Sequence, residues 1–184
     1  MTMTFTSATA AHQGQWTTPP RWAVHTAKAA ALTTVPSGLW RVAAALGIPV
    51  GFSGDNPMAD VGFGSGFSLY MIALSVFAEC LGLLSLGLVQ RWGEVFPRWF
   101  PFIGGRRVPV SFAVTSAGLG SLALMYLTVS GALNWNTPDT MGGPEAPKGT
   151  AALVMGACYA PLLLWGPLLA VVTVAYAVRR RPRT

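Results

Sequence analysis

Four long apolar runs, separated by short polar stretches, occupy most of this chain. They extend over about residues 29–50, 66–90, 108–133 and 151–178. Each reaches the roughly 20 residues that an α-helix needs to cross about 30 Å of hydrocarbon. None of them alternates apolar and polar residues as the strands of a membrane barrel do. The pattern therefore predicts an all-α, polytopic membrane protein built as a bundle of four transmembrane helices.

Prolines and end segments refine this prediction. Pro36 should kink the first helix, and Pro161 with Pro167 predicts a kinked or tilted fourth helix. Residues 1–20 are rich in Thr, Ala and Ser, with neither the basic nor the apolar segment of a signal peptide. We expect residues 1–20 to form a flexible tail and residues 21–184 to form one membrane domain.

Basic residues collect on one side of the membrane if the chain crosses it four times. Ten of the 12 Lys and Arg residues then lie on the side of both termini: Arg21, Lys28, Arg91, Arg98, Arg106, Arg107, Arg179, Arg180, Arg181 and Arg183. The other side has Lys148 as its only basic residue, beside four acidic residues: Asp55, Asp60, Asp139 and Glu145. The positive-inside rule then predicts cytoplasmic termini in a bacterial inner membrane, the plasma membrane of the cell.

Two charged residues interrupt the apolar runs. Arg41 lies in the first run and Glu79 in the second, each about 17–18 Å from the cytoplasmic side when counted along its helix. Adjacent antiparallel helices usually pack together, so the sequence predicts a direct or water-bridged Arg41–Glu79 pair. Such a pair can hold two helices together. It can also form a proton or substrate site, with Glu79 titrating and Arg41 anchoring an anion.

The stretch between the second and third runs mixes aromatic and basic side chains. Trp92 and Trp99 lie among Arg98, Arg106 and Arg107. Aromatic rings favour the headgroup region and arginines bind the phosphates of anionic lipids, so we expect an interfacial loop. A docking surface for a cytosolic protein uses the same residue types and stays open as an alternative.

Two stretches of the sequence resemble a known group of proteins. The loop WGEVFPRWFPFIGGRRVPV, from Trp92 to Val110, resembles a loop of small four-span membrane proteins of high-GC actinobacteria, and the run GLWRVAAALGIPVG, from Gly38 to Gly51, extends the likeness. The resemblance implies a four-span inner-membrane protein. It brings no activity with it.

The sequence predicts neither a catalytic residue nor a cofactor or metal site. It contains no phosphate-binding, dinucleotide-binding or zinc-hydrolase motif. His12 and His25 both precede the first run, which argues against a haem held by histidines in the bundle. Cys80 and Cys158 are isolated within apolar runs and should be small buried side chains. The formal net charge of +6 follows from topology, so nucleic acid is not an expected partner.

Three functions remain after these exclusions. The first is a non-catalytic accessory or interaction subunit, which would bind a membrane-protein partner or a second copy of itself within the bilayer. The alternative is a small transporter or channel that uses Arg41 and Glu79. The third is a membrane enzyme acting on lipid, with Glu79 as the acid or base.

Overall fold

The computed structural model describes residues 18–54, 56–95, 105, 108–138 and 140–180. The elements that these residues form are all helices, as predicted, and none of the described residues forms a strand. The helices are α1 (Arg21–Leu32), α2 (Val35–Ala45), α3 (Gly66–Gly87), the short 3₁₀ helix η1 (Arg91–Glu94), α4 (Val110–Leu133), α5 (Thr150–Tyr159) and α6 (Leu162–Arg180).

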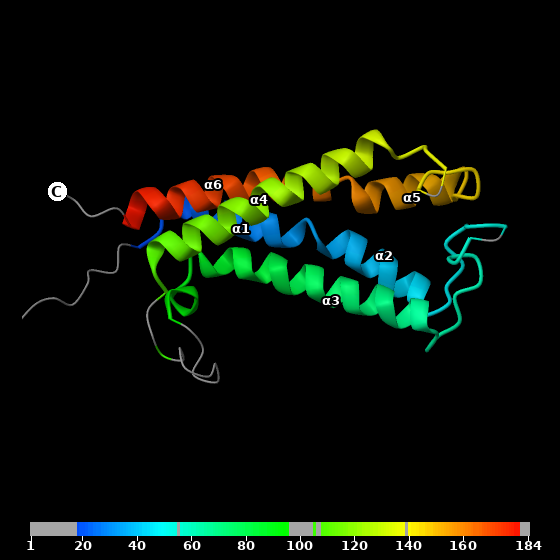
Figure 1. Cartoon of the computed structure of the whole chain (residues 1–184), viewed down its shortest axis with the longest axis horizontal. Coiled ribbons are helices and arrows are strands. Elements are labelled where there is room, and N and C mark those ends of the chain that lie inside the picture. Colours follow the sequence, from blue (N-terminus) through cyan, green and yellow to red (C-terminus); the bar gives the residue numbers. More distant parts are fainter. Residues whose placement is uncertain (1–17, 55, 96–104, 106–107, 139, 181–184) are drawn as a thin grey trace, which may run out of the picture.

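The long helices lie side by side, with their axes roughly parallel (Figure 1). Both ends of the described chain lie at the same end of the molecule, together with η1. We call this the termini end. The opposite end is formed by the connections over residues 46–65 and 134–149, and we call it the far end.

Within the described part of the chain, three helical segments are long and apolar enough to cross a membrane, which indicates a membrane protein. They are α3, α4 and the combined segment Thr150–Arg180 that contains α5 and α6. Each begins and ends within three residues of the run predicted from hydropathy. The second, third and fourth predicted helices are therefore confirmed as helices.

The first helix is displaced from its predicted position. It begins at Arg21 instead of residue 29 and ends at Ala45 instead of residue 50, so the predicted limits are wrong. Pro20 precedes the first turn in an extended conformation. At the other end Gly47 has φ +83°, and Ile48 N–H donates to the carbonyl of Ala43 at 3.1 Å. This is a glycine-terminated helix end, so capping residues and not hydropathy set the limits.

This first helix is interrupted where the sequence predicted a kink. Thr33 and Thr34 separate α1 from α2, and Pro36 lies in the first turn of α2. Pro36 has no N–H for the carbonyl four residues earlier, so the α-helical ladder stops. The Thr34 hydroxyl donates to the carbonyl of Ala31 at 2.9 Å, satisfying part of the freed backbone. We call α1 and α2 together the first interrupted helix.

A second interruption occurs between α5 and α6. Ala160 and Pro161 form a turn there, and Pro161 cannot donate to the carbonyl of Ala157. The chain continues into α6, which also contains Pro167. The predicted distortion of the fourth helix is thus an actual break. We call α5 and α6 together the second interrupted helix.

The two interrupted helices form the middle of the molecule. α1 packs against α6 and α2 against α5, while α3 packs on the first interrupted helix and α4 packs on α6. Ala23, Ala27 and Ala30 are essentially fully buried, so small side chains let α1 approach its neighbours closely. α3 and α4 thus pack on different members of this pair, and neither packs extensively on the other.

Candidate intramembrane site

A row of buried polar side chains lies between the first interrupted helix and α3. We call it the polar seam, and its hydroxyl members are Thr34, Ser68 and Ser75, all of them buried. Most of these hydroxyls donate to backbone carbonyls; Ser68, for example, donates across the helix pair to Ala45 at 2.7 Å. Buried hydroxyls that cross between helices hold the helices in a defined register.

Glu79 lies in the middle of the seam. The hydroxyl of Thr34, at the helix interruption, donates to Glu79 Oε2 at 2.9 Å. The other carboxylate oxygen, Oε1, is buried and has no hydrogen-bond partner among the described residues. Gly38 makes room for it, since a Cβ at that position would lie 2.8 Å from Oε1. Gly82 likewise leaves space for the Thr34 hydroxyl.

Arg41 lies closer to the far end than predicted. Because the helix begins at Arg21, Arg41 is about 30 Å along it and only one turn before Ala45. Arg41 therefore lies nearer the end of its helix than the sequence indicated, and its depth in a membrane stays a prediction. Its Nε donates to Ser75 Oγ at 3.1 Å, and its guanidinium lies 5.9 Å from the centre of the Tyr159 ring. Its Nη2 is buried without a hydrogen-bond partner among the described residues.

The structure brings Arg41 and Glu79 to one interface but gives each a separate partner. Arg41 bonds to Ser75, whereas Glu79 bonds to Thr34. Ser75 and Glu79 are four residues apart on α3, which is one helical turn. The two atoms left over, Nη2 and Oε1, are not joined by a hydrogen bond. A water-bridged pair stays a prediction.

This arrangement can bind a small polar group. A buried donor or acceptor without a partner costs about 1–3 kcal/mol, and more when the group is charged. Such atoms in a folded protein call for an explanation, such as water, an ion or a functional role. Arg41 offers a donor and Glu79 an acceptor on the same helix interface, so a solute or water molecules can be held by either group.

Sequence reasoning missed Thr34, Ser75 and Gly38 as members of the site. Their spacing contained the signal. Thr34, Gly38 and Arg41 recur at intervals of four and three residues, and Ser75 precedes Glu79 by four. Intervals of three and four residues place side chains on one face of a helix. Two polar faces of this kind on consecutive helices predict a polar interface.

Most of the predicted interfacial loop lies outside the described residues. This applies to Arg98, Trp99, Arg106 and Arg107. Trp92 is described: it lies in η1, its indole N–H donates to Gln90 Oε1, and its ring is half exposed. A contact that we did not expect closes this end, because Arg179 Nη2 donates to the carbonyl of Leu88 at 3.0 Å. A basic side chain at the C-terminal end of α3 complements the helix dipole.

The two cysteines make no disulfide and belong to no metal site. Cys80 lies exposed on the surface of α3, so its predicted burial is wrong, and Cys158 is partly buried. A helix that faces lipid can expose an apolar thiol at little cost. Among the described residues no cluster of His, Cys, Asp and Glu could hold a metal ion.

Comparison with known proteins adds no family to this description. No protein-family model, curated protein or solved structure matches the chain.

Proposed function

We propose that the chain is a four-span protein of a bacterial inner membrane with both termini in the cytoplasm. The first interrupted helix runs beside the three candidate spans, and at about 37 Å it is long enough to cross with them. The resemblance of the loop Trp92–Val110 to small four-span proteins of actinobacteria supports the same topology. Its aromatic and basic residues would anchor this loop among anionic lipid headgroups.

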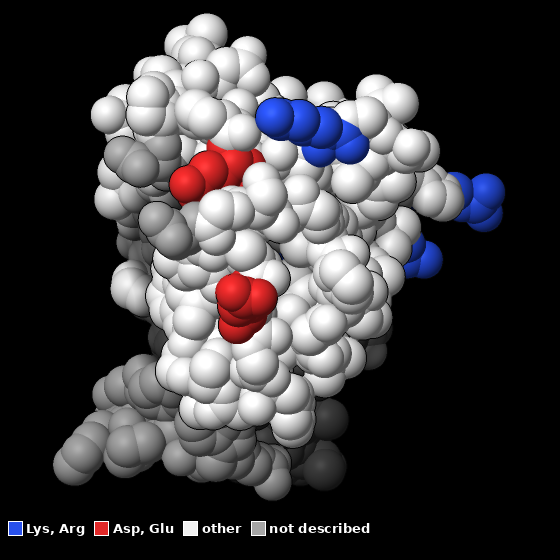
Figure 2. All heavy atoms as spheres, turned by 90° about the vertical axis from the view of Figure 1, so that its right-hand side faces the viewer, with Lys and Arg blue, Asp and Glu red and all other residues white. Residues whose placement is uncertain are grey.

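The distribution of charge supports this orientation. Arg21 and Arg179 lie near the ends of helices at the termini end, whereas Asp60 and Glu145 belong to the far end. Figure 2 looks onto the far end, where both acidic and basic side chains lie on a surface that is mostly uncharged. Basic residues on one side favour a cytoplasmic location of that side.

Cysteines at the far end should react only with reagent added outside the cell. Ser53 and Thr137 are exposed in the two far-end connections, so Ser53→Cys and Thr137→Cys report on that side. Both should be labelled in intact cells by a thiol reagent that cannot cross membranes, in a chain whose Cys80 and Cys158 are replaced by alanine. Labelling that requires opening the cells would contradict the orientation.

The activity that the geometry favours is transport of a small polar solute through the polar seam. The observation that carries it is the pair of buried, unpartnered atoms, Arg41 Nη2 and Glu79 Oε1. In a purely structural charge pair, each charged group should have its hydrogen-bond partners, because a buried charge without a partner is costly. Interrupted helices support the same function, since transporters place their sites at breaks in transmembrane helices. Thr34, at such a break, contacts Glu79 directly.

Water access to the seam tests this function. In the cysteine-free background, Thr34→Cys and Ser75→Cys should react with a small, charged, membrane-impermeant thiol reagent in proteoliposomes. A transport path admits water to these buried positions at least part of the time. Val76→Cys is the matched control, because Val76 is exposed on the outer surface of α3 and should face lipid. Failure of both seam positions to react would mean a dry interface and a structural role.

The accessory-subunit function is the second candidate, and α4 favours it. Ser121 is the one buried residue of this helix, which leaves most of its apolar surface open to lipid, a partner helix or a second copy. Purification from native membranes distinguishes the candidates, because an accessory subunit should bring a stoichiometric partner. A lipid-active enzyme would need further reacting groups beside Glu79, and nothing in the seam besides hydroxyls and Arg41 offers them.

A further inference from the structure

The carboxyl group of Glu79 has one oxygen in a hydrogen bond and one without any. Oε1 is buried without a hydrogen-bond partner among the described residues, and it lies against α2 at Gly38, where a Cβ would come within 2.8 Å of it. An ionised carboxylate spreads its charge over two oxygens, and both need donors. A buried oxygen without a donor is more costly in a charged group than in a neutral one. Oε1 therefore suits the carbonyl oxygen of a neutral carboxylic acid.

The hydrogen bonding of the other oxygen, Oε2, indicates the same neutral form. Thr34 Oγ1 lies 2.9 Å from Oε2 and 2.9 Å from the carbonyl oxygen of Ala31. A hydroxyl has one proton to donate and two lone pairs that accept. If Glu79 is ionised, Thr34 has one proton for two acceptors, and one of the two contacts lacks a hydrogen. If Glu79 is protonated, its O–H donates to Thr34 and the Thr34 O–H donates to Ala31, so that both contacts are complete hydrogen bonds.

The charged groups around Glu79 agree with a neutral carboxyl. α1 and α2 pack against α3, and Arg41 is the charged residue of these two helices that lies at the interface. Arg41 donates to Ser75 and not to Glu79. The other titratable side chains of α1 and α3 are exposed: Arg21, His25, Lys28, Tyr70 and Cys80. η1 packs on α3 at Gly87, about 12 Å along the helix from Glu79. No ion pair therefore holds Glu79 in its charged form.

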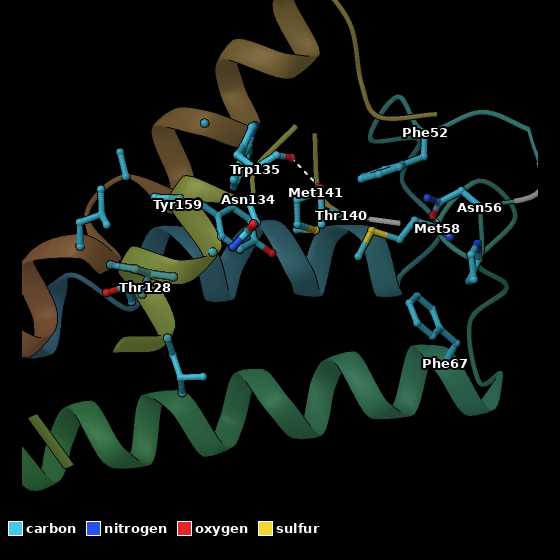
Figure 3. A pocket seen from close by; sticks show the side chains of 18 residues that line it. Phe52, Asn56, Met58, Phe67, Thr128, Asn134, Trp135, Thr140, Met141 and Tyr159 are labelled. Atoms are coloured by element: carbon cyan, nitrogen blue, oxygen red, sulfur yellow. Dashed lines mark hydrogen bonds between the residues drawn. The ribbon is translucent and has the colours of Figure 1, made fainter. Parts of the chain in front are cut away.

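Glu79 lies outside two large cavities of the molecule. Their volumes are about 700 and 530 Å³, and Figure 3 shows the first, with Asn134 and Tyr159 in its wall. Neither Thr34 nor Glu79 lines either cavity. Oε1 is itself buried in this conformation. A proton is the ligand that binds a carboxyl group without needing a cavity.

We propose that Glu79 binds a proton in this closed conformation, with Thr34 accepting the hydrogen bond, and that it releases the proton when water enters the polar seam. Water supplies donors to both carboxylate oxygens and solvates the charge, so opening of the seam favours the ionised form. Solute movement through the seam is then coupled to proton movement. This coupling rests on the proposed transport function, whereas the protonated carboxyl does not.

Infrared spectroscopy in nanodiscs tests the protonated carboxyl. A protonated carboxylic acid has a C=O stretching band at a higher frequency than amides and carboxylates, and Glu79 should contribute such a band at neutral pH. Glu79→Gln should abolish this band. The variant should still fold, because its amide N–H can donate to Thr34 as the acid does. Asp60→Asn is the control, because Asp60 is exposed at the far end and should contribute nothing to the band. A spectrum that Glu79→Gln leaves unchanged would overturn the proposal.

Two variants of Thr34 test its part in the site. Thr34→Ser keeps the hydroxyl and should preserve the frequency of the Glu79 band. Thr34→Val keeps the shape but removes the acceptor of the Glu79 proton, so the band should shift. An unshifted band in Thr34→Val would mean that Thr34 does not accept from Glu79.

The pH dependence of cysteine labelling tests the coupling. In the cysteine-free background, the reactivity of Ser75→Cys should rise with pH more steeply than that of Ser53→Cys, which is exposed at the far end and reports the ionisation of an open thiol. Adding Glu79→Gln should remove the excess. Labelling of Ser75→Cys without an excess would overturn the coupling and leave the solute path intact. No labelling of Thr34→Cys or Ser75→Cys at any pH, with the Glu79 band present, would overturn transport and leave the protonated carboxyl.

Discussion

Replacing both membrane charges with methionine should stabilise the protein. We expect the Arg41→Met and Glu79→Met double variant to gain about 1–4 kcal/mol in free energy of unfolding, the range found when buried ionic groups are replaced by apolar ones of similar size. No hydroxyl would be stranded. Ser75 accepts from Arg41 and would keep its own donation to the carbonyl of Met71 at 2.8 Å. The hydroxyl of Thr34, which lies 2.9 Å from both Glu79 and the carbonyl of Ala31, would give its single proton to Ala31. Reversible unfolding in nanodiscs or detergent measures the gain.

The two single variants decide what the charges do. If each charge has its own partner, as the structure shows, the single effects should add to within about 0.5 kcal/mol. If the two charges instead form a pair that holds the helices together, Arg41→Met and Glu79→Met would each destabilise the protein, and the double variant would recover much of the loss. A coupling energy above about 1 kcal/mol would therefore favour a water-bridged pair. Functional sites often cost stability, so a functional site here should show two effects in the double variant. The protein should become more stable, and the seam should lose its access to solute.

The helical nature of the chain was predictable because long apolar runs are a local property of sequence. α3, α4 and the combined α5–α6 segment agree closely with those runs. The first helix was misplaced because hydropathy ignores capping. Residues 21–28 are mixed in polarity and were left out, although Pro20 marks a helix start and Gly47 a helix end. The position of Arg41 along the helix was misjudged for the same reason.

The details of the candidate site depend on how the helices align, and hydropathy does not report alignment. Arg41 and Glu79 were correctly assigned to adjacent helices, because helices that follow each other in the chain usually lie side by side. Their partners depend on a register that places Ser75 opposite Arg41, and Glu79 opposite Thr34. A shift of one turn would have joined the two charges instead.

The packing of α4 on α6, which leaves α3 uncovered on that side, had no counterpart in the sequence analysis. It is a property of the whole packing arrangement.

Gly166 of α6 lets α4 pack closely on α6, and replacing it with a larger residue should lower stability strongly. A Cβ on Gly166 of α6 would lie 2.9 Å from the backbone nitrogen of Met125, 3.0 Å from the carbonyl oxygen of Ser121, and 2.6 Å from Met125 Cγ. Backbone atoms cannot rotate away as a side chain can, so α4 must move. Gly166→Ala should destabilise the protein by about 1–3 kcal/mol, despite the better helix propensity of alanine.

Gly118→Ala is the control for this prediction. Gly118 lies within α4, and a Cβ there would meet nothing within 4 Å. We expect this variant to be neutral or to gain up to about 1 kcal/mol from helix propensity. Equal stability of the two alanine variants would mean that α4 and α6 are not in contact at Gly166.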